Sequence, residues 1–333
     1  MTVEPKTEHE KTEHEWTIHS LNIHGLFFQR WCEHVVAHTR GWRLRYTEYP
    51  VGFPSPYFPG QQTNESALDL RADHSAQGDL LSILVECKKN NPDFVNWIFF
   101  PPERDAHPSP SALVVHRVVN VANGSADGGW TVQSEVFVPR ISNFPFATEA
   151  REVRGSYQDY KKGDKTKTSN AAISDACQQI ALATQAIVDE ETHLSRALGT
   201  ANPPASMPFR KLHIIPAIVT TAHLFTCEFD PAGVDPKMGE IAQDAAKLEE
   251  VKRVVLRYAL PPRLQKAPKD LAERLEWRRR GAELLAYMPI LVVQAESLPA
   301  LLGDFASQMD GGAAGWLYAG PSEAGVRLAS PTT

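Results

Sequence analysis

Two strand-like segments joined by a short polar turn constrain the fold of this chain more than any other feature. Residues 68–73 alternate between apolar and polar side chains, and residues 80–88 are mostly apolar until a charged end. Both patterns are typical of β-strands, and the polar residues 74–78 between them are typical of a turn. The two segments therefore predict a β-hairpin.

The charged side chains of this hairpin are expected to meet. Side chains of a strand alternate between its two faces, so Glu86 and Lys88 share one face. By the same rule Asp69 faces away from Leu68 and Leu70, and pairing of the strands brings Asp69 and Glu86 together. Two carboxylates suit Mg²⁺ or Mn²⁺. A lysine beside them can act on an attacking water and on developing negative charge.

The predicted elements around the hairpin follow a definite order. Helical spacing of apolar residues predicts a helix over residues 21–39, ended by Gly41, and a strand follows over 42–49. After the hairpin, a helix capped by Ser169 or Asn170 is expected to run to about Glu190, followed by a strand over 212–221. Further strands are predicted over 97–100, 112–122, 131–138, 223–229, 251–260 and 288–293, with a closing helix over 298–309.

This order of helix, three strands, helix and strand, together with Asp69 and Glu86-Cys87-Lys88, resembles the PD-(D/E)xK, or restriction-endonuclease-like, nuclease superfamily. The resemblance implies an α/β fold with a restriction-endonuclease-like core: a mixed central sheet flanked by helices, with inserted and C-terminal extra strands. It implies that Asp69, Glu86 and Lys88 are catalytic and that Asp69 and Glu86 bind the metal. Leu68 stands where the family name has proline.

The resemblance also implies further site residues. Glu33, on the first predicted helix, resembles the glutamate that many members add as a metal ligand, and the carbonyl of Cys87 would be an extra ligand. Gln178 or Gln179 resembles the glutamine of members with a fourth motif. The implied activity is Mg²⁺- or Mn²⁺-dependent hydrolysis of nucleic-acid phosphodiester bonds. Bacterial defence, restriction and repair are typical settings for such enzymes.

Two alternatives stay open. The first is a catalytically silent nuclease-like module used for nucleic-acid binding or protein assembly; the intact set of Asp69, Glu86 and Lys88 argues against it. The second is an α/β binding protein with a fortuitous Glu-x-Lys pattern.

The distribution of charge permits a polyanionic partner although the net charge is −6. Basic residues cluster in two segments, 151–167 and 251–280, and such clusters are plausible contacts for phosphates. We expect nucleic acid as the partner, with DNA preferred over RNA, and leave a homodimer or a partner protein open. The expected nucleic-acid contacts are Lys161, Lys162, Lys165, Lys167, Arg278, Arg279 and Arg280.

The ends of the chain differ from its centre. Residues 1–15 contain a polar direct repeat with nothing to bury and are expected to be a disordered tail. Residues 16–330 are predicted to form a single nuclease-like domain, with its core over about 21–222 and a C-terminal elaboration over 223–330. No apolar run approaches the length of a membrane span, so a cytoplasmic protein without a membrane partner is expected.

Overall fold

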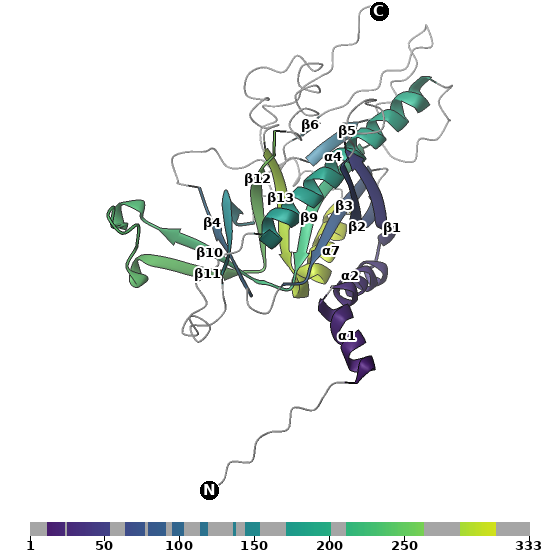
Figure 1. The fold of residues 1–333 in the computed structure, drawn as a ribbon. Coiled ribbons are helices and arrows are strands. Elements are labelled where there is room, and N and C mark those ends of the chain that lie inside the picture. Colours follow the sequence, from purple (N-terminus) through teal and green to yellow (C-terminus); the bar gives the residue numbers. More distant parts are fainter. Residues whose placement is uncertain are drawn as a thin grey trace, which may run out of the picture.

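A mixed β-sheet with helices on both faces forms the centre of the computed structural model, and a second, smaller sheet lies beside it (Figure 1). The structure describes residues 12–23, 25–53, 64–76, 79–90, 95–102, 114–118, 136–137, 144–153, 171–200, 211–262 and 287–310. The protein thus has an α/β fold, as the sequence predicted. Within those ranges, no helix has the length and apolar character required to cross a membrane.

Within the described ranges the main sheet has nine strands. Its principal order is β1 (Trp42–Phe53), β2 (Asn64–Ala76), β3 (Asp79–Lys88), β9 (Lys211–Thr220), β13 (Tyr287–Gln294), β12 (Arg253–Ala259) and β7 (Phe146–Ala147). The strand β2 is antiparallel to both of its neighbours, β1 and β3, which confirms the predicted hairpin, and β9 lies parallel to β3. Two further strands, β5 (Val114–Val118) and β6 (Val136–Phe137), extend the sheet from β9.

Among the residues that the structure describes, three helices cover this sheet. The helix α4 (Ala171–Thr200) packs on one face, over a core that includes Leu84, Ile180 and Ile218. The helices α2 (Leu26–His38) and α7 (Leu298–Asp310) pack on the other face, over a core that includes Ile83 and Val219. The succession α2, β1, β2, β3, α4, β9 is the one predicted from the sequence.

The second sheet has the order β11 (Ala246–Val251), β10 (His223–Phe229), β4 (Asn96–Phe100) and β8 (Glu149–Val153). It also positions α4, because the buried Glu152 of β8 accepts a hydrogen bond from the backbone N–H of Ile173 at 2.9 Å. A carboxylate at this place satisfies a free N–H group and is favoured by the helix dipole. The predicted caps Ser169 and Asn170 lie outside the described residues.

Several element boundaries differ from prediction. The single helix expected over 21–39 is two helices, α1 (Glu13–Ile23) and α2, separated at Gly25, whose φ of 77° ends one helix and starts the next. Residues 13–15, expected in the tail, therefore belong to α1. The helix α4 continues ten residues beyond Glu190, to Thr200. Short 3-10 turns cover Pro231–Gly233, Gln243–Ala245 and Ala295–Ser297.

Candidate functional site

The predicted site lies where β2 and β3 separate. Their ladder ends at the pair Leu70 and Val85, after which β2 stays paired with β1 and β3 stays paired with β9. In place of the next ladder bond, the backbone N–H of Cys87 donates to Oδ2 of Asp69 at 2.6 Å. The side chain of Asp69 therefore fills the gap between the two strands and is fixed by the backbone of β3.

Asp69 and Glu86 come together at this point. The register of the hairpin, continued by one step past Leu70 and Val85, sets Asp69 opposite Glu86. Glu86 is almost completely buried, and its Oε1 lies 2.9 Å from Nζ of Lys88. The two predicted carboxylates thus meet in a largely desolvated place beside one positively charged side chain, that of Lys88.

Lys88 links this pair to the helix on the same face. Its Nζ donates to Oε1 of Gln179, on α4, at 2.7 Å. Of the two candidate glutamines, Gln179 rather than Gln178 makes this contact. The geometry therefore selects Gln179 from the predicted pair and places it beside the lysine.

The strand alternation assumed from the sequence fails at Asp69. Leu68 packs in the core under α4, whereas Leu70 packs in the core under α2 and α7, although a regular strand would direct both to one side. The partner strand has the matching irregularity: Thr47 pairs with Leu70 and Tyr49 with Leu68, so Glu48 lies opposite Asp69. The expectation that Asp69 simply faces away from both leucines is wrong, because both strands reset their alternation here.

Glu48 has an unusual backbone. Its φ is 49°, in the left-handed region that non-glycine residues rarely adopt, at a cost on the order of 1 kcal/mol. A register shift between Leu44 and Tyr46 precedes it. The two irregularities bring a third carboxylate toward Asp69 from β1.

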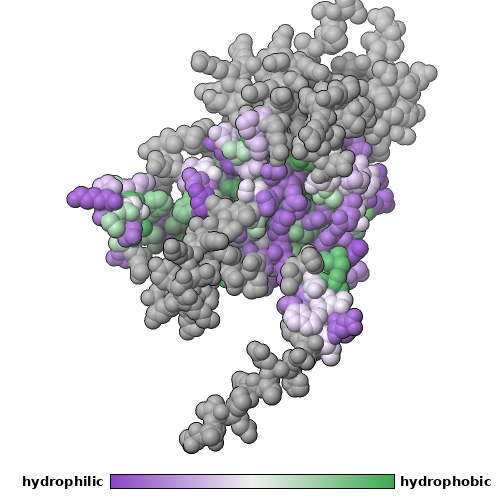
Figure 2. Space-filling view, viewed as in Figure 1, coloured by the Kyte–Doolittle hydropathy of each residue, from purple (hydrophilic) through white to green (hydrophobic). Residues whose placement is uncertain are grey.

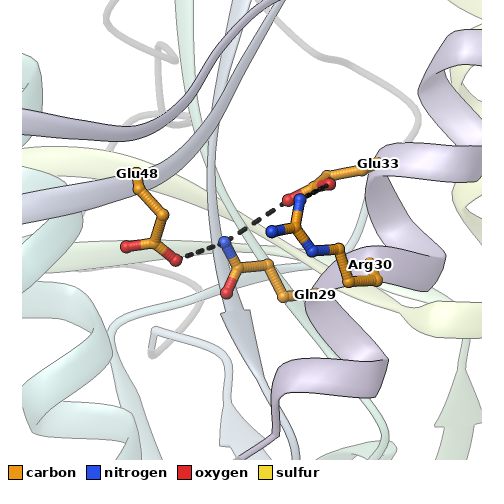
Figure 3. Close-up of polar contacts among 4 residues, drawn as sticks. All are labelled: Gln29, Arg30, Glu33 and Glu48. Atoms are coloured by element: carbon orange, nitrogen blue, oxygen red, sulfur yellow. Dashed lines mark hydrogen bonds and ion pairs between the residues drawn. The ribbon is translucent and has the colours of Figure 1, made fainter.

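A fourth carboxylate comes from α2. Nε2 of Gln29 donates to Glu48 at 2.6 Å and lies 3.5 Å from Oε1 of Glu33, so one amide bridges the two acids (Figure 3). Nη1 of Arg30 donates to the other oxygen of Glu33 at 2.7 Å. Glu33 is buried and lies near enough to Asp69 to affect its ionisation. The predicted approach of Glu33 to this site from the helix agrees with the structure.

Burial and mutual repulsion raise the pKa values of the central carboxyls. Burial raises the pKa of Glu86 to about 7, with a further upward contribution from Asp69 and an opposing one from Lys88. Burial likewise raises the pKa of Asp69 to about 6, against the effects of the Cys87 N–H and Lys88, while Glu48 and Glu33 add to the rise. Loss of solvent around the charged form is the main physical cause, and the neighbouring acids add to it.

The donor set fits a hard cation only in part. Carboxylate oxygens are the ligands that Mg²⁺ and Mn²⁺ prefer, and a cation would offset the crowding that raises these pKa values. Among the residues that the structure describes, however, no three His, Cys, Asp or Glu side chains lie close enough to hold a metal ion together. Asp69 and Glu86 lie opposite each other, and Glu33 would have to move to join them as a third ligand.

The side chain of Cys87 points to the opposite face of the sheet from those of Glu86 and Lys88. Its thiol hydrogen-bonds to Cys32 of α2, which, with burial, raises its pKa well above the usual range. The thiol therefore faces the α2 side while Glu86 and Lys88 face α4, as alternation along β3 predicts. The backbone N–H of Cys87 donates its hydrogen bond to Asp69. The backbone carbonyl of Cys87 is therefore the group that could make the predicted metal contact.

The predicted nucleic-acid contacts fall outside the described part of the chain. Neither the lysines of 161–167 nor Arg278, Arg279 and Arg280 belong to it. Sequence reasoning also missed Glu48, Gln29 and Arg30. A signal for Gln29 and Arg30 was present, because they lie one helical turn before Glu33. Glu48 required the register between β1 and β2.

Comparison with known proteins adds no relative. No family model matches the chain, and no curated protein or solved structure matches it either. The restriction-endonuclease-like core accordingly remains a prediction.

Proposed function

We propose that this protein is a metal-dependent nuclease that hydrolyses phosphodiester bonds of nucleic acids at the site formed by Asp69, Glu86 and Lys88. The observation that carries the proposal is the meeting of Asp69 and Glu86 at the separation of β2 and β3, beside Lys88. Support also comes from the order of α2, β1, β2, β3, α4 and β9, which agrees with the order that the resemblance implies.

The carboxylates would hold the cation. Asp69 and Glu86 form the central pair, Glu33 joins from α2, and the carbonyl of Cys87 completes the set. A bound Mg²⁺ or Mn²⁺ supplies a Lewis acid for the phosphate and lowers the pKa of a coordinated water. Because Glu86 is buried and Asp69 is half-buried, their interaction with a cation is weakly screened by solvent.

Lys88 would act on the substrate. Its ammonium lies beside Glu86 and is oriented by Gln179, so it is positioned to hold a water nucleophile and to offset charge on the pentavalent phosphorus. The role of Gln179 is to orient Lys88, which makes it a positioning residue. This division assigns metal binding to the acids and transition-state stabilisation to the lysine.

The proposal is tested with purified protein on plasmid, linear duplex, single-stranded DNA and RNA, with Mg²⁺, Mn²⁺ or a chelator. Cleavage is expected with the metals and is expected to vanish with the chelator and in Glu86→Ala. The matched control is Glu149→Ala, which removes an exposed acid on β8, away from the site. Cleavage by Glu86→Ala at the wild-type rate would overturn the assignment.

A second candidate is a catalytically silent nuclease-like module. The observation that favours it is the ion pair between Lys88 and Glu86, together with the lack of any three-ligand cluster among the described residues. A silent module would bind nucleic acid equally with metal and with chelator and would cleave none of the substrates. The same panel therefore separates the two candidates.

A further inference from the structure

The strand β11 leaves one edge of the second sheet open. The hairpin of β10 and β11 projects away from the main sheet (Figure 1). β11 pairs with β10 along one edge, and no strand within the described ranges pairs with its other edge. An open edge presents unpaired N–H and C=O groups that can accept another strand.

The side chains of β11 divide between two faces. Lys247 and Glu249 lie on one face, 3.7 Å apart, and their side chains are 73% and 66% exposed. Leu248 lies on the other face, opposite Cys227 of β10, and is 58% exposed. On that face Phe229 is also exposed, and Figure 2 shows apolar and hydrophilic residues side by side on the projecting hairpin.

Two-fold symmetry restricts how two such edges can pair. In a symmetric antiparallel pair the axis stands perpendicular to the sheet, so one residue lies opposite its own copy. Registers that use five residues of β11 are centred on Leu248 or on Glu249. Centring on Glu249 places two negative charges directly opposite each other, which is destabilising.

A register centred on Leu248 places no like charges directly opposite each other on either face of the strand. Leu248 then meets its own copy, and Glu250 on the same face lies opposite Ala246 of the second copy. On the other face Lys247 lies opposite Glu249 of the second copy, and the symmetry repeats this opposite-charge pair. Charged residues in an edge strand usually discourage pairing with other strands, but here their order is complementary to itself.

We propose that two copies of this chain associate through antiparallel pairing of their β11 edges, centred on Leu248. The edge alone is small beside the ~1,600 Å² of a standard protein–protein interface. The dimer is therefore weak and depends on concentration. This inference is independent of the proposed nuclease function, because it uses neither the acids nor the lysine of the site.

Sedimentation velocity on the full chain over a concentration series tests the proposal. The mass is expected to rise from the 36.9 kDa of one chain toward twice that value. Lys247→Glu creates two Glu–Glu pairs and Glu249→Lys creates two Lys–Lys pairs. Each variant is expected to weaken association by about tenfold or more. A wild type that stays monomeric throughout, or single variants that associate as the wild type does, would overturn the proposal.

Restoration tests the register itself. In a mixed dimer of Lys247→Glu with Glu249→Lys, every Glu lies opposite a Lys of the other copy. A dimer of two chains that each carry both substitutions has the same Glu–Lys pairs. Both are therefore expected to associate like the wild type. Failure to restore association contradicts the register.

Lys237→Glu is the matched control, since it makes the same charge change on the hairpin outside β11. An equal loss in this control would show that total charge, rather than pairing, governs association.

Discussion

Nζ of Lys88, on β3, donates a hydrogen bond to Oε1 of Gln179, on α4, at 2.7 Å, although the two residues are 91 positions apart in the chain. This contact joins the sheet to the helix that covers it. With the 2.9 Å ion pair to Glu86, it fixes the ammonium beside this buried acid. The position of α4, which Glu152 helps to set, thereby determines the position of the lysine.

Gln179→Ala is predicted to lower turnover on a cleaved substrate by about tenfold, because the lysine loses the group that orients it. KM is expected to change little, since the glutamine does not touch substrate in this account. Gln178→Ala is the matched control and should retain nearly the wild-type rate. Steady-state kinetics on both variants provide the measurement, and equal losses would remove the distinction between the two glutamines.

The stability of the metal-free protein is predicted to fall as pH rises. The folded pKa of Glu86, about 7, lies above its ordinary value of 4.5, so folding favours the protonated form. The stabilisation that protonated Glu86 gives the folded state is complete below about pH 4.5 and is lost as pH rises through about 7. The free energy of unfolding is expected to fall by at most about 3 kcal/mol over this range.

Urea unfolding at pH 5 and pH 8, with chelator present, measures this dependence. Glu86→Gln should have a smaller difference between the two pH values than the wild type, because the amide does not titrate. An equally large difference in this variant would mean that other groups cause it.

Gln29→Leu is predicted to destabilise the protein by about 2 kcal/mol, since it removes the donor that bridges Glu48 and Glu33. Adding Glu48→Gln to this variant should recover part of the loss, because one of the two negative charges is then absent. Urea unfolding at neutral pH measures both variants. An unchanged midpoint in Gln29→Leu would show that the bridge contributes nothing to the fold.

Much of the core could be predicted from the sequence because its signals are local. The period-two pattern of β2 and the apolar run of β3 ending in charge predicted the hairpin. Helical spacing predicted α2, although Gly25 divides the first helix, and a capping residue predicted the start of α4. The meeting of Asp69 and Glu86 could be predicted from the hairpin register. The side of the sheet that Leu68 faces could not, because the alternation of β2 is irregular at Asp69.

The remaining features depend on tertiary structure. Glu48 comes near Asp69 only because of a register shift and a positive φ at a non-glycine residue, neither of which leaves a sequence pattern. The strands β8 and β11 are short and rich in charge, so neither has the alternation that predicts a strand. Their place in a second sheet is fixed by pairing with β4 and β10.

The basic segment 251–280 is predicted to contact nucleic-acid phosphates. Reversal of Arg278, Arg279 and Arg280 to Glu should weaken binding and flatten its dependence on salt, because fewer counterions are released. Fluorescence anisotropy at several salt concentrations measures both quantities, with Lys237→Glu as the control. An unchanged affinity and salt slope would exclude these arginines as phosphate contacts.

The central claim is tested most directly by measuring Mn²⁺ binding and cleavage in parallel for the wild type, Glu86→Ala and Lys88→Ala. Glu86→Ala is predicted to lose both metal affinity and cleavage, because the acid is a ligand. Lys88→Ala is predicted to keep metal and substrate binding and to lose at least ~10²-fold in turnover, the scale of one positioned electrostatic group. A wild-type rate in Lys88→Ala, on a substrate that the wild type cleaves, would contradict the account.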